Sequence, residues 1–130
     1  MPMERAIELF AAINFLVIGI SHVVQPRAWA EFFGWLRSKG LAGSFVNGFL
    51  SLWFGSLIVG FHNVWTGIPA VLTFIGWAQV VKGTLAFVYP QLGLRSMALV
   101  SPEHARRFVA PGMLLAGIGG LLVYHLVRFG

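Results

Sequence analysis

The chain has 130 residues, of which 58% are hydrophobic and 10% are charged, and its mean hydropathy is +0.82. A soluble domain carries about 25% charged residues, so this composition indicates an integral membrane protein. The absence of cysteine excludes disulfides, thiolate metal sites and thiol nucleophiles. The net charge of +5 comes from basic residues between apolar runs, where they act as topology and anionic-lipid signals. We therefore expect a lipid bilayer, and no nucleic acid, as partner.

Four long apolar runs predict four transmembrane helices. They cover residues 6–24, 41–61, 67–89 and 108–127, and each approaches or exceeds the roughly 20 residues that a helix needs to cross a bilayer. The first run is longer than a usual signal-peptide core, so we expect it to be retained. The connections are too short to fold separately. The sequence thus predicts an all-α integral membrane protein with a single membrane domain over residues 1–130.

A segment between the first two runs predicts a short helix in the cytoplasmic membrane interface, over about residues 27–39. Its large apolar side chains recur at helical spacing and gather on one face: Trp29, Phe32, Phe33 and Leu36. Arg37 and Lys39 lie away from the centre of that face. Aromatic residues beside basic ones are typical of an interfacial anchor.

The remaining connections predict the course of the chain. Residues 61–69 leave room only for a tight turn, so the second and third spans form a helical hairpin. After the third span, Pro90 and Gly93 are expected to end the helix. The last helix is expected to begin in water at about residue 102, and Pro111 is expected to kink it near the interface.

The distribution of basic residues predicts the orientation. Six of them lie in the two longer connections: Arg27, Arg37, Lys39, Arg95, Arg106 and Arg107. Only Arg5 and Arg128 flank the other side. The positive-inside rule therefore places the two longer connections in the cytoplasm and both termini outside.

The two halves of the chain resemble each other when residues 6–66 are aligned without gaps on residues 70–130. The identical positions are Ala6/Ala70, Phe10/Phe74, Val17/Val81, Gly19/Gly83, Val24/Val88, Pro26/Pro90, Gly48/Gly112, Leu50/Leu114, Gly55/Gly119, Leu57/Leu121 and Val59/Val123. Three glycines and a helix-ending proline fall in register, which biased composition alone explains poorly. The alignment predicts two parallel two-helix repeats, related by a pseudo-twofold axis along the membrane normal.

Polar side chains inside the apolar runs predict a pocket that opens toward the cytoplasm. Lys82 lies about seven residues, or roughly 10 Å, from the cytoplasmic end of the third span, where a charged group needs a partner. The candidate ligand-binding residues are Lys82, Gln79, Asn47, His22, Asn14 and Gln25. An interior ammonium there would suit an anionic headgroup, a carboxylate or a quinone oxygen. Two alternatives stay open: a hydrogen-bond network between helices, or a Lys82 that snorkels to the interface.

The other ionisable residues are less informative. His62 and His125 fall at the outer ends of their spans and are the candidate ligands for a metal or a haem, but interfacial histidine is the commoner case. Glu8 is expected to be solvated, with Arg5 as its partner one turn away. The chain has no aspartate and no paired glutamates, so we expect no intrinsic catalysis.

Two segments resemble the glycine-then-proline helix ends of small bacterial four-helix DoxX-like membrane proteins: VIGISHVVQPRAWAEFFGWL in the first span and VVKGTLAFVYPQLG in the third. The resemblance covers these segments and the helix arrangement. It implies a bacterial inner-membrane protein, and some members of that family are associated with quinone-linked oxidoreductase complexes. The chain has no cysteine, so we expect no thiol-based redox role. The resemblance assigns a function to no individual residue of this chain.

Three functions remain after these exclusions. Small residues recur at helical spacing in the second and fourth spans, which leaves packing surface for other subunits. This favours a binding or assembly subunit of a homo-oligomer or a larger membrane complex. The alternative is a small transporter or channel with a polar pathway around Lys82. A haem- or quinone-binding redox subunit is the third hypothesis.

Overall fold

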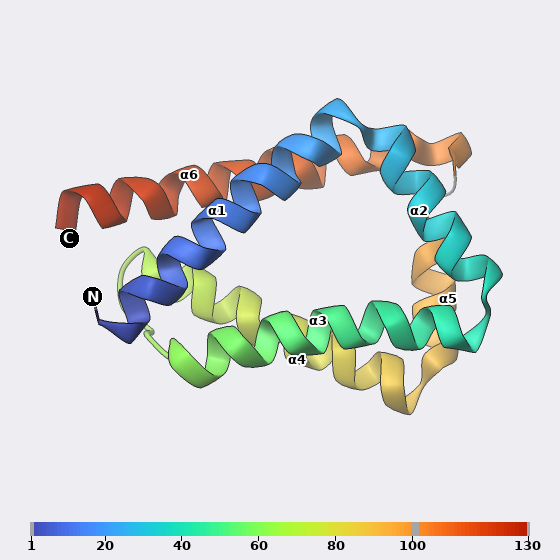
Figure 1. Cartoon of the computed structure of the whole chain (residues 1–130), viewed down its shortest axis with the longest axis horizontal. Coiled ribbons are helices and arrows are strands. Elements are labelled where there is room, and N and C mark those ends of the chain that lie inside the picture. Colours follow the sequence, from blue (N-terminus) through green and yellow to red (C-terminus); the bar gives the residue numbers. More distant parts are fainter. Residues whose placement is uncertain (1, 100–101, 130) are drawn as a thin grey trace.

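The computed structural model describes residues 2–99 and 102–129, and this part of the chain is all-α (Figure 1). Its elements are α1 (Met3–Val24), α2 (Pro26–Ser38), α3 (Leu41–Phe61), α4 (Pro69–Val88), α5 (Pro90–Ala98), the 3-10 segment η1 (Pro102–Phe108) and α6 (Val109–Phe129). Helices α1, α3 and α4, and α6 together with most of η1, are long and apolar enough to cross a membrane. They agree with the four predicted spans and fit a multi-pass membrane protein.

The four long helices pack as two pairs. Helix α1 lies against α6, and α3 lies against α4, whereas α1 meets α3 and α4 over much shorter stretches. Figure 1 shows both ends of the chain and the turn between α3 and α4 at one end of the molecule, which we call the terminal end. Helices α2 and α5 lie with η1 at the opposite, connecting end (Figure 1).

Glycines set the close approach within each pair. A Cβ atom built at Gly19 would lie 2.5 Å from the nitrogen of Ala116 and 2.7 Å from the carbonyl oxygen of Gly112. Real Cβ atoms do not come so close to backbone, so a larger residue would push α1 and α6 apart. Such small-residue contacts are how helices associate where lipid supplies no hydrophobic drive. The predicted small stripes of the second and fourth spans thus face α4 and α1 and do not face each other.

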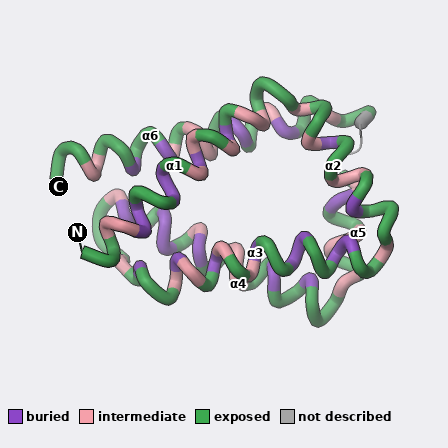
Figure 2. The backbone as a smooth tube through the Cα atoms, viewed as in Figure 1, coloured by how far each residue is buried: buried purple, intermediate pink, exposed green. Residues whose placement is uncertain are grey.

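The buried apolar core draws residues from all four long helices. It consists of Ile7, Ala11, Ala12, Phe15, Ile58, Leu72 and Leu122. Figure 2 shows buried residues along the faces where helices meet and exposed residues on the outer sides. Large apolar side chains such as Phe74 and Val127, which are 66% and 81% exposed, cover those outer sides. A lipid environment accounts for so much exposed apolar surface.

The connecting end holds two short helices, of which the sequence predicted one. Helix α2 begins and ends one residue before the predicted segment. The third span ends at Val88, two residues before Pro90, as expected. The chain then starts a further helix, α5, of which Pro90 is the first residue and which contains Gly93. Proline is favoured at the first helical position, where its missing N–H would have no partner. The hydroxyl of Ser44 on α3 donates to the Pro90 carbonyl at 2.8 Å and ties α5 to the long helices.

The last span deviates from a regular helix before its proline and not at it. Backbone angles leave the helical region at His104 (φ −117°, ψ 30°), within the 3-10 segment that precedes α6. Pro111 lies in the first turn of the uninterrupted α6. The kink predicted at Pro111 is therefore wrong, because a proline in the first turn of an α-helix removes no hydrogen bond of that helix.

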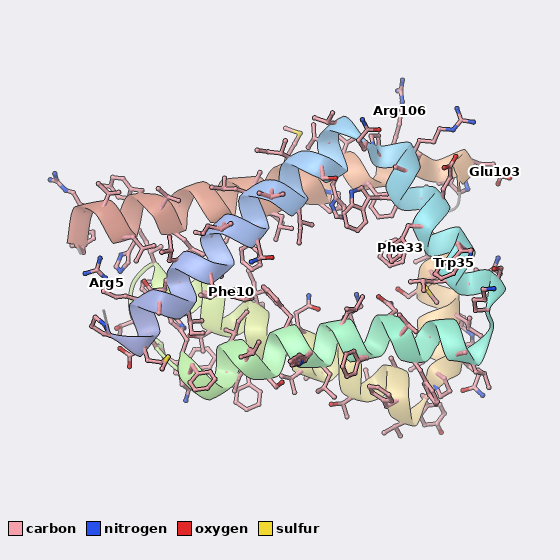
Figure 3. The ribbon with its side chains drawn as sticks, in the orientation of Figure 1. Arg5, Phe10, Phe33, Trp35, Glu103 and Arg106 are labelled. Atoms are coloured by element: carbon pink, nitrogen blue, oxygen red, sulfur yellow. The ribbon has the colours of Figure 1, made fainter. Side chains whose placement is uncertain are left out.

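Leu36→Ala should lower the free energy of unfolding by about 2–5 kcal/mol, the usual loss for a buried leucine. Leu36 is 1% exposed where the end of α2 packs on the bundle. Its neighbour Trp35 is 55% exposed and projects from α2 (Figure 3), so Trp35→Ala should change the free energy by about 0.5 kcal/mol or less. Unfolding in mixed micelles titrated with SDS and followed by circular dichroism measures both. Equal losses for the two variants would mean that α2 does not dock as described.

Candidate functional site

The predicted Lys82 and Asn47 line one cavity near the connecting end, which we call the Lys82 cavity. It has a volume of about 260 Å³. Its lining residues come from α3, α4 and α5: Asn47, Ala78, Val81, Lys82, Leu85, Ala86, Leu92, Gly93 and Ser96. Asn47 is 7% exposed, whereas Lys82 is exposed. The cavity therefore combines one ammonium and one buried amide with mostly apolar walls.

Across residues 2–99 and 102–129, the Lys82 ammonium makes no hydrogen bond and no ion pair, so neither Asn47 nor Gln79 is its partner. Gln79 lies one turn earlier on α4, is half-buried, and packs its Cβ against Gly55 of α3. Gln79 therefore belongs to the contact between α3 and α4 and does not line the Lys82 cavity. The charge of Lys82 is consequently left for solvent, lipid or a ligand.

The three candidate residues on α1 lie elsewhere. Asn14 donates to the carbonyl of Phe10 at 2.8 Å, and His22 Nδ1 donates to the carbonyl of Ile18 at 2.7 Å. The His22 ring stacks on Trp29 at 4.1 Å between ring centroids. Gln25 lines a second cavity of about 370 Å³ with Ser21, Ala28, Trp29 and Phe32. The six predicted residues do not form one pocket, because α1 pairs with α6 and not with α4.

The expectation that Glu8 is solvated is wrong. Its carboxylate is buried, with the residue 3% exposed, and its Oε2 lies 2.9 Å from His62 Nε2. His62 is fully buried, and its Nδ1 lies 3.0 Å from the hydroxyl of Thr73 on α4. His62, the residue that directly follows α3, thus packs against Glu8 on α1. We call Glu8, His62, Thr73 and His125 the Glu8 cluster.

His125 brings the fourth long helix to this cluster. Its Nε2 lies 3.9 Å from Glu8 Oε1. Within the part of the chain that the structure describes, Glu8 Oε1 and His125 Nδ1 are buried without a hydrogen-bond partner. A cavity of about 210 Å³ adjoins them, lined by Arg5, Glu8, His125, Leu126 and Phe129. Figure 3 shows Arg5 at the same terminal end, where it donates to the Leu126 carbonyl at 3.3 Å.

The two histidines that were the candidate metal or haem ligands are thus bridged by a glutamate. His62 is occupied on both ring nitrogens, by Glu8 and by Thr73. Across the described residues, no group of three or more His, Cys, Asp or Glu side chains is arranged to hold a metal ion.

Comparison of the chain with protein-family models, with curated proteins and with solved structures found no match.

Proposed function

We propose that the protein is a multi-pass inner-membrane protein of bacteria that acts as a binding and assembly subunit of an oligomer or of a larger membrane complex. The observation that carries this proposal is the Lys82 cavity, in which an ammonium that has no partner among the described residues lies beside a buried amide. The resemblance of its helix ends to DoxX-like proteins supports the same assignment.

The chemistry of the cavity favours an anionic, amphiphilic ligand. Lys82 lies six residues before the last residue of α4, a depth of about 9 Å, so a carboxylate or phosphate at the membrane surface is within reach of its long side chain. The Asn47 amide adds donors for a second ligand oxygen. The volume of about 260 Å³ suits a headgroup, while an acyl chain would follow the apolar wall toward the lipid.

Lys82→Met should weaken binding of anionic lipid at least tenfold and leave the fold intact. The test is retention of phosphatidylglycerol, and separately of oleate, by the purified protein in native mass spectrometry. Lys39→Met is the matched control, because it makes the same change at the exposed lysine beside Trp35 and should retain both lipids. Retention of phosphatidylglycerol alone identifies a phosphate ligand, and retention of oleate identifies a carboxylate. Equal retention by Lys82→Met and the wild type would overturn the proposal.

The assembly part of the proposal rests on the large apolar surface and on the small enclosed volumes. Aromatic side chains such as Phe49 and Trp53 are about half exposed and stack on each other on the outer side of α3. A homo-oligomer would place such faces against neighbouring protomers. A stable, ligand-free monomer in detergent would contradict this part.

We further propose that α1–α3 and α4–α6 are two repeats. The alignment of residues 6–66 with residues 70–130 carries the approach of Gly19 to Gly112 onto the approach of Gly83 to Gly48. A Cβ atom built at Gly19 would lie 2.7 Å from the Gly112 carbonyl oxygen, and one built at Gly83 would lie 2.8 Å from the Gly48 carbonyl oxygen. It also carries the start of α2 at Pro26 onto the start of α5 at Pro90. These matched contacts support a pseudo-twofold relation between the halves.

The proposed orientation places the connecting end in the cytoplasm and both termini outside. The six basic residues of the two longer connections belong to this end, and Figure 3 shows Arg106 and Glu103 there. The proposed interfacial role of α2 is supported by exposed Trp35, over whose ring the Lys39 ammonium lies at 5.5 Å. Reporter fusions at the termini should be accessible from outside the cell, and labelling from the cytoplasm would overturn the orientation.

A further inference from the structure

The hydroxyl of Thr73 determines the protonation of His62 Nδ1. A hydroxyl donates one hydrogen bond, and the nearest acceptor of Thr73 Oγ1 is the Val64 carbonyl at 2.7 Å. The other carbonyls in reach, those of His62 and Pro69, lie at 3.5 Å. With its proton directed to Val64, Thr73 Oγ1 accepts from the Val64 N–H at 3.2 Å and from His62 Nδ1 at 3.0 Å. His62 therefore carries a proton on Nδ1.

A proton must then lie between His62 and Glu8. With Nδ1 protonated, His62 Nε2 is either the lone-pair nitrogen of neutral imidazole or a donor in imidazolium. At 2.9 Å from Glu8 Oε2, the first state requires a protonated carboxyl as donor, and the second pairs imidazolium with carboxylate. Both states hold the same number of protons and are electrically neutral. Without that proton, two lone pairs would face each other beside an uncompensated buried negative charge, which is strongly destabilising.

We propose that Glu8 and His62 form a proton-binding site that holds one shared proton and exchanges it through Glu8 Oε1 and His125 with the cavity at the terminal end. The exchange route follows from the two buried polar atoms without partners, Glu8 Oε1 and His125 Nδ1, beside a cavity of about 210 Å³. A shift of the His125 ring that shortens the 3.9 Å separation completes a chain of proton-carrying groups from His62 to the cavity.

Every long helix that meets the cluster contributes to its electrostatics. Helix α1 contributes Glu8 and Arg5, the end of α3 contributes His62, and α6 contributes His125. Helix α4 contributes the neutral Thr73, and its Lys82 lies nine residues further along, about 13 Å away along the helix. Arg5 and His125 are thus the other ionisable side chains that line the cavity beside the shared proton.

The shared proton also joins the two helix pairs. Glu8 belongs to the α1–α6 pair, whereas His62 and Thr73 belong to the α3–α4 pair, and the pairs otherwise meet over short stretches. Loss of the proton would replace this hydrogen bond by repulsion between two acceptors. Proton binding is thus linked to the contact between the pairs, in a chain whose proposed ligand cavity lies at the opposite end.

The test is ¹⁵N NMR of histidine-labelled protein in lipid bilayers, which distinguishes the two neutral tautomers from imidazolium. We expect His62 to be protonated on Nδ1 around neutral pH, either as the Nδ1–H tautomer or as imidazolium. In Glu8→Gln the amide donates to Nε2, and His62 should become a neutral Nδ1–H tautomer. His22, whose Nδ1 bonds to the Ile18 carbonyl, is the internal control and should not change. A neutral Nε2–H tautomer of His62 in the wild type would overturn the site, and this measurement needs no variant.

The exchange route has its own measurement. His125→Phe should slow exchange of the His62 ring protons with water at least tenfold, because it removes the group between Glu8 Oε1 and the cavity. His104→Phe, which changes an exposed histidine at the connecting end, should leave that rate unchanged. An unchanged rate in His125→Phe would overturn the proposed route.

Discussion

Gly19→Ala and Gly83→Ala should each lower the free energy of unfolding by about 1–3 kcal/mol, the usual loss for an overpacked contact. At Gly19 the new methyl would lie 2.5 Å from the Ala116 nitrogen, and at Gly83 it would lie 2.6 Å from the Leu52 nitrogen. Backbone atoms cannot move aside as a flexible side chain can, so each helix pair must separate. Titration of mixed micelles with SDS measures the loss.

Adjacent glycines on α6 supply the control. A methyl at Gly119 would meet the Leu16 nitrogen at 2.9 Å, whereas a methyl at Gly120 would meet nothing within 4 Å. Gly119→Ala should therefore destabilise, and Gly120→Ala should be neutral within about 0.5 kcal/mol. Gly19 and Gly83 lie in different helix pairs and share no partner, so their losses should add. Equal effects of Gly119→Ala and Gly120→Ala would show that helix propensity, and not close packing, determines the result.

The spans were predictable from the sequence because a helix crossing a bilayer must be apolar along its whole length. The bounds of α3 are those of the second apolar run, and α1 and α4 differ from their runs by a few residues. Helix α5 was missed because Pro90 and Gly93 are read locally as breakers, although proline at a first position begins helices as well. Local sequence does not distinguish these two roles.

The pairing of the helices was not predictable, and the candidate site depended on it. Polar residues at equal depth were combined into one pocket, but depth alone does not say which helices are neighbours. Asn47 and Lys82 share a cavity because α3 packs on α4, whereas His22 lies on α1 against Trp29 of α2 and Phe108 of η1.

One feature of the sequence pointed to the Glu8 cluster, but a second feature argued against it. Glu8 is the single acidic residue within the four apolar runs, and an ionisable residue in a membrane span calls for a partner. Its position near a helix end suggested solvation by water. The partner His62 lies beyond the end of α3, and only the fold of the following turn brings it over Glu8.

Glu8→Leu should lower the free energy of unfolding by about 3–5 kcal/mol, the usual loss when one partner of a buried pair is removed. The change leaves His62, which is fully buried and held by Thr73, without its second hydrogen-bond partner. Glu4→Leu, at an exposed position one turn earlier on α1, is the matched control and should be neutral within about 0.5 kcal/mol. Unfolding in SDS-titrated micelles again supplies the measurement.

The double variant Glu8→Leu/His62→Leu should lose less than the sum of its single variants, with a coupling energy of about 0.5–3 kcal/mol. Removing both partners leaves no buried polar group unpaired, and an apolar pair of similar volume is often as stable as the ion pair that it replaces. Glu8→Gln should be the mildest of the set, because its amide nitrogen can donate to His62 Nε2 across the same 2.9 Å contact. Strictly additive losses would mean that Glu8 and His62 are stabilised by separate neighbours, so that no hydrogen bond between them holds the two helix pairs together.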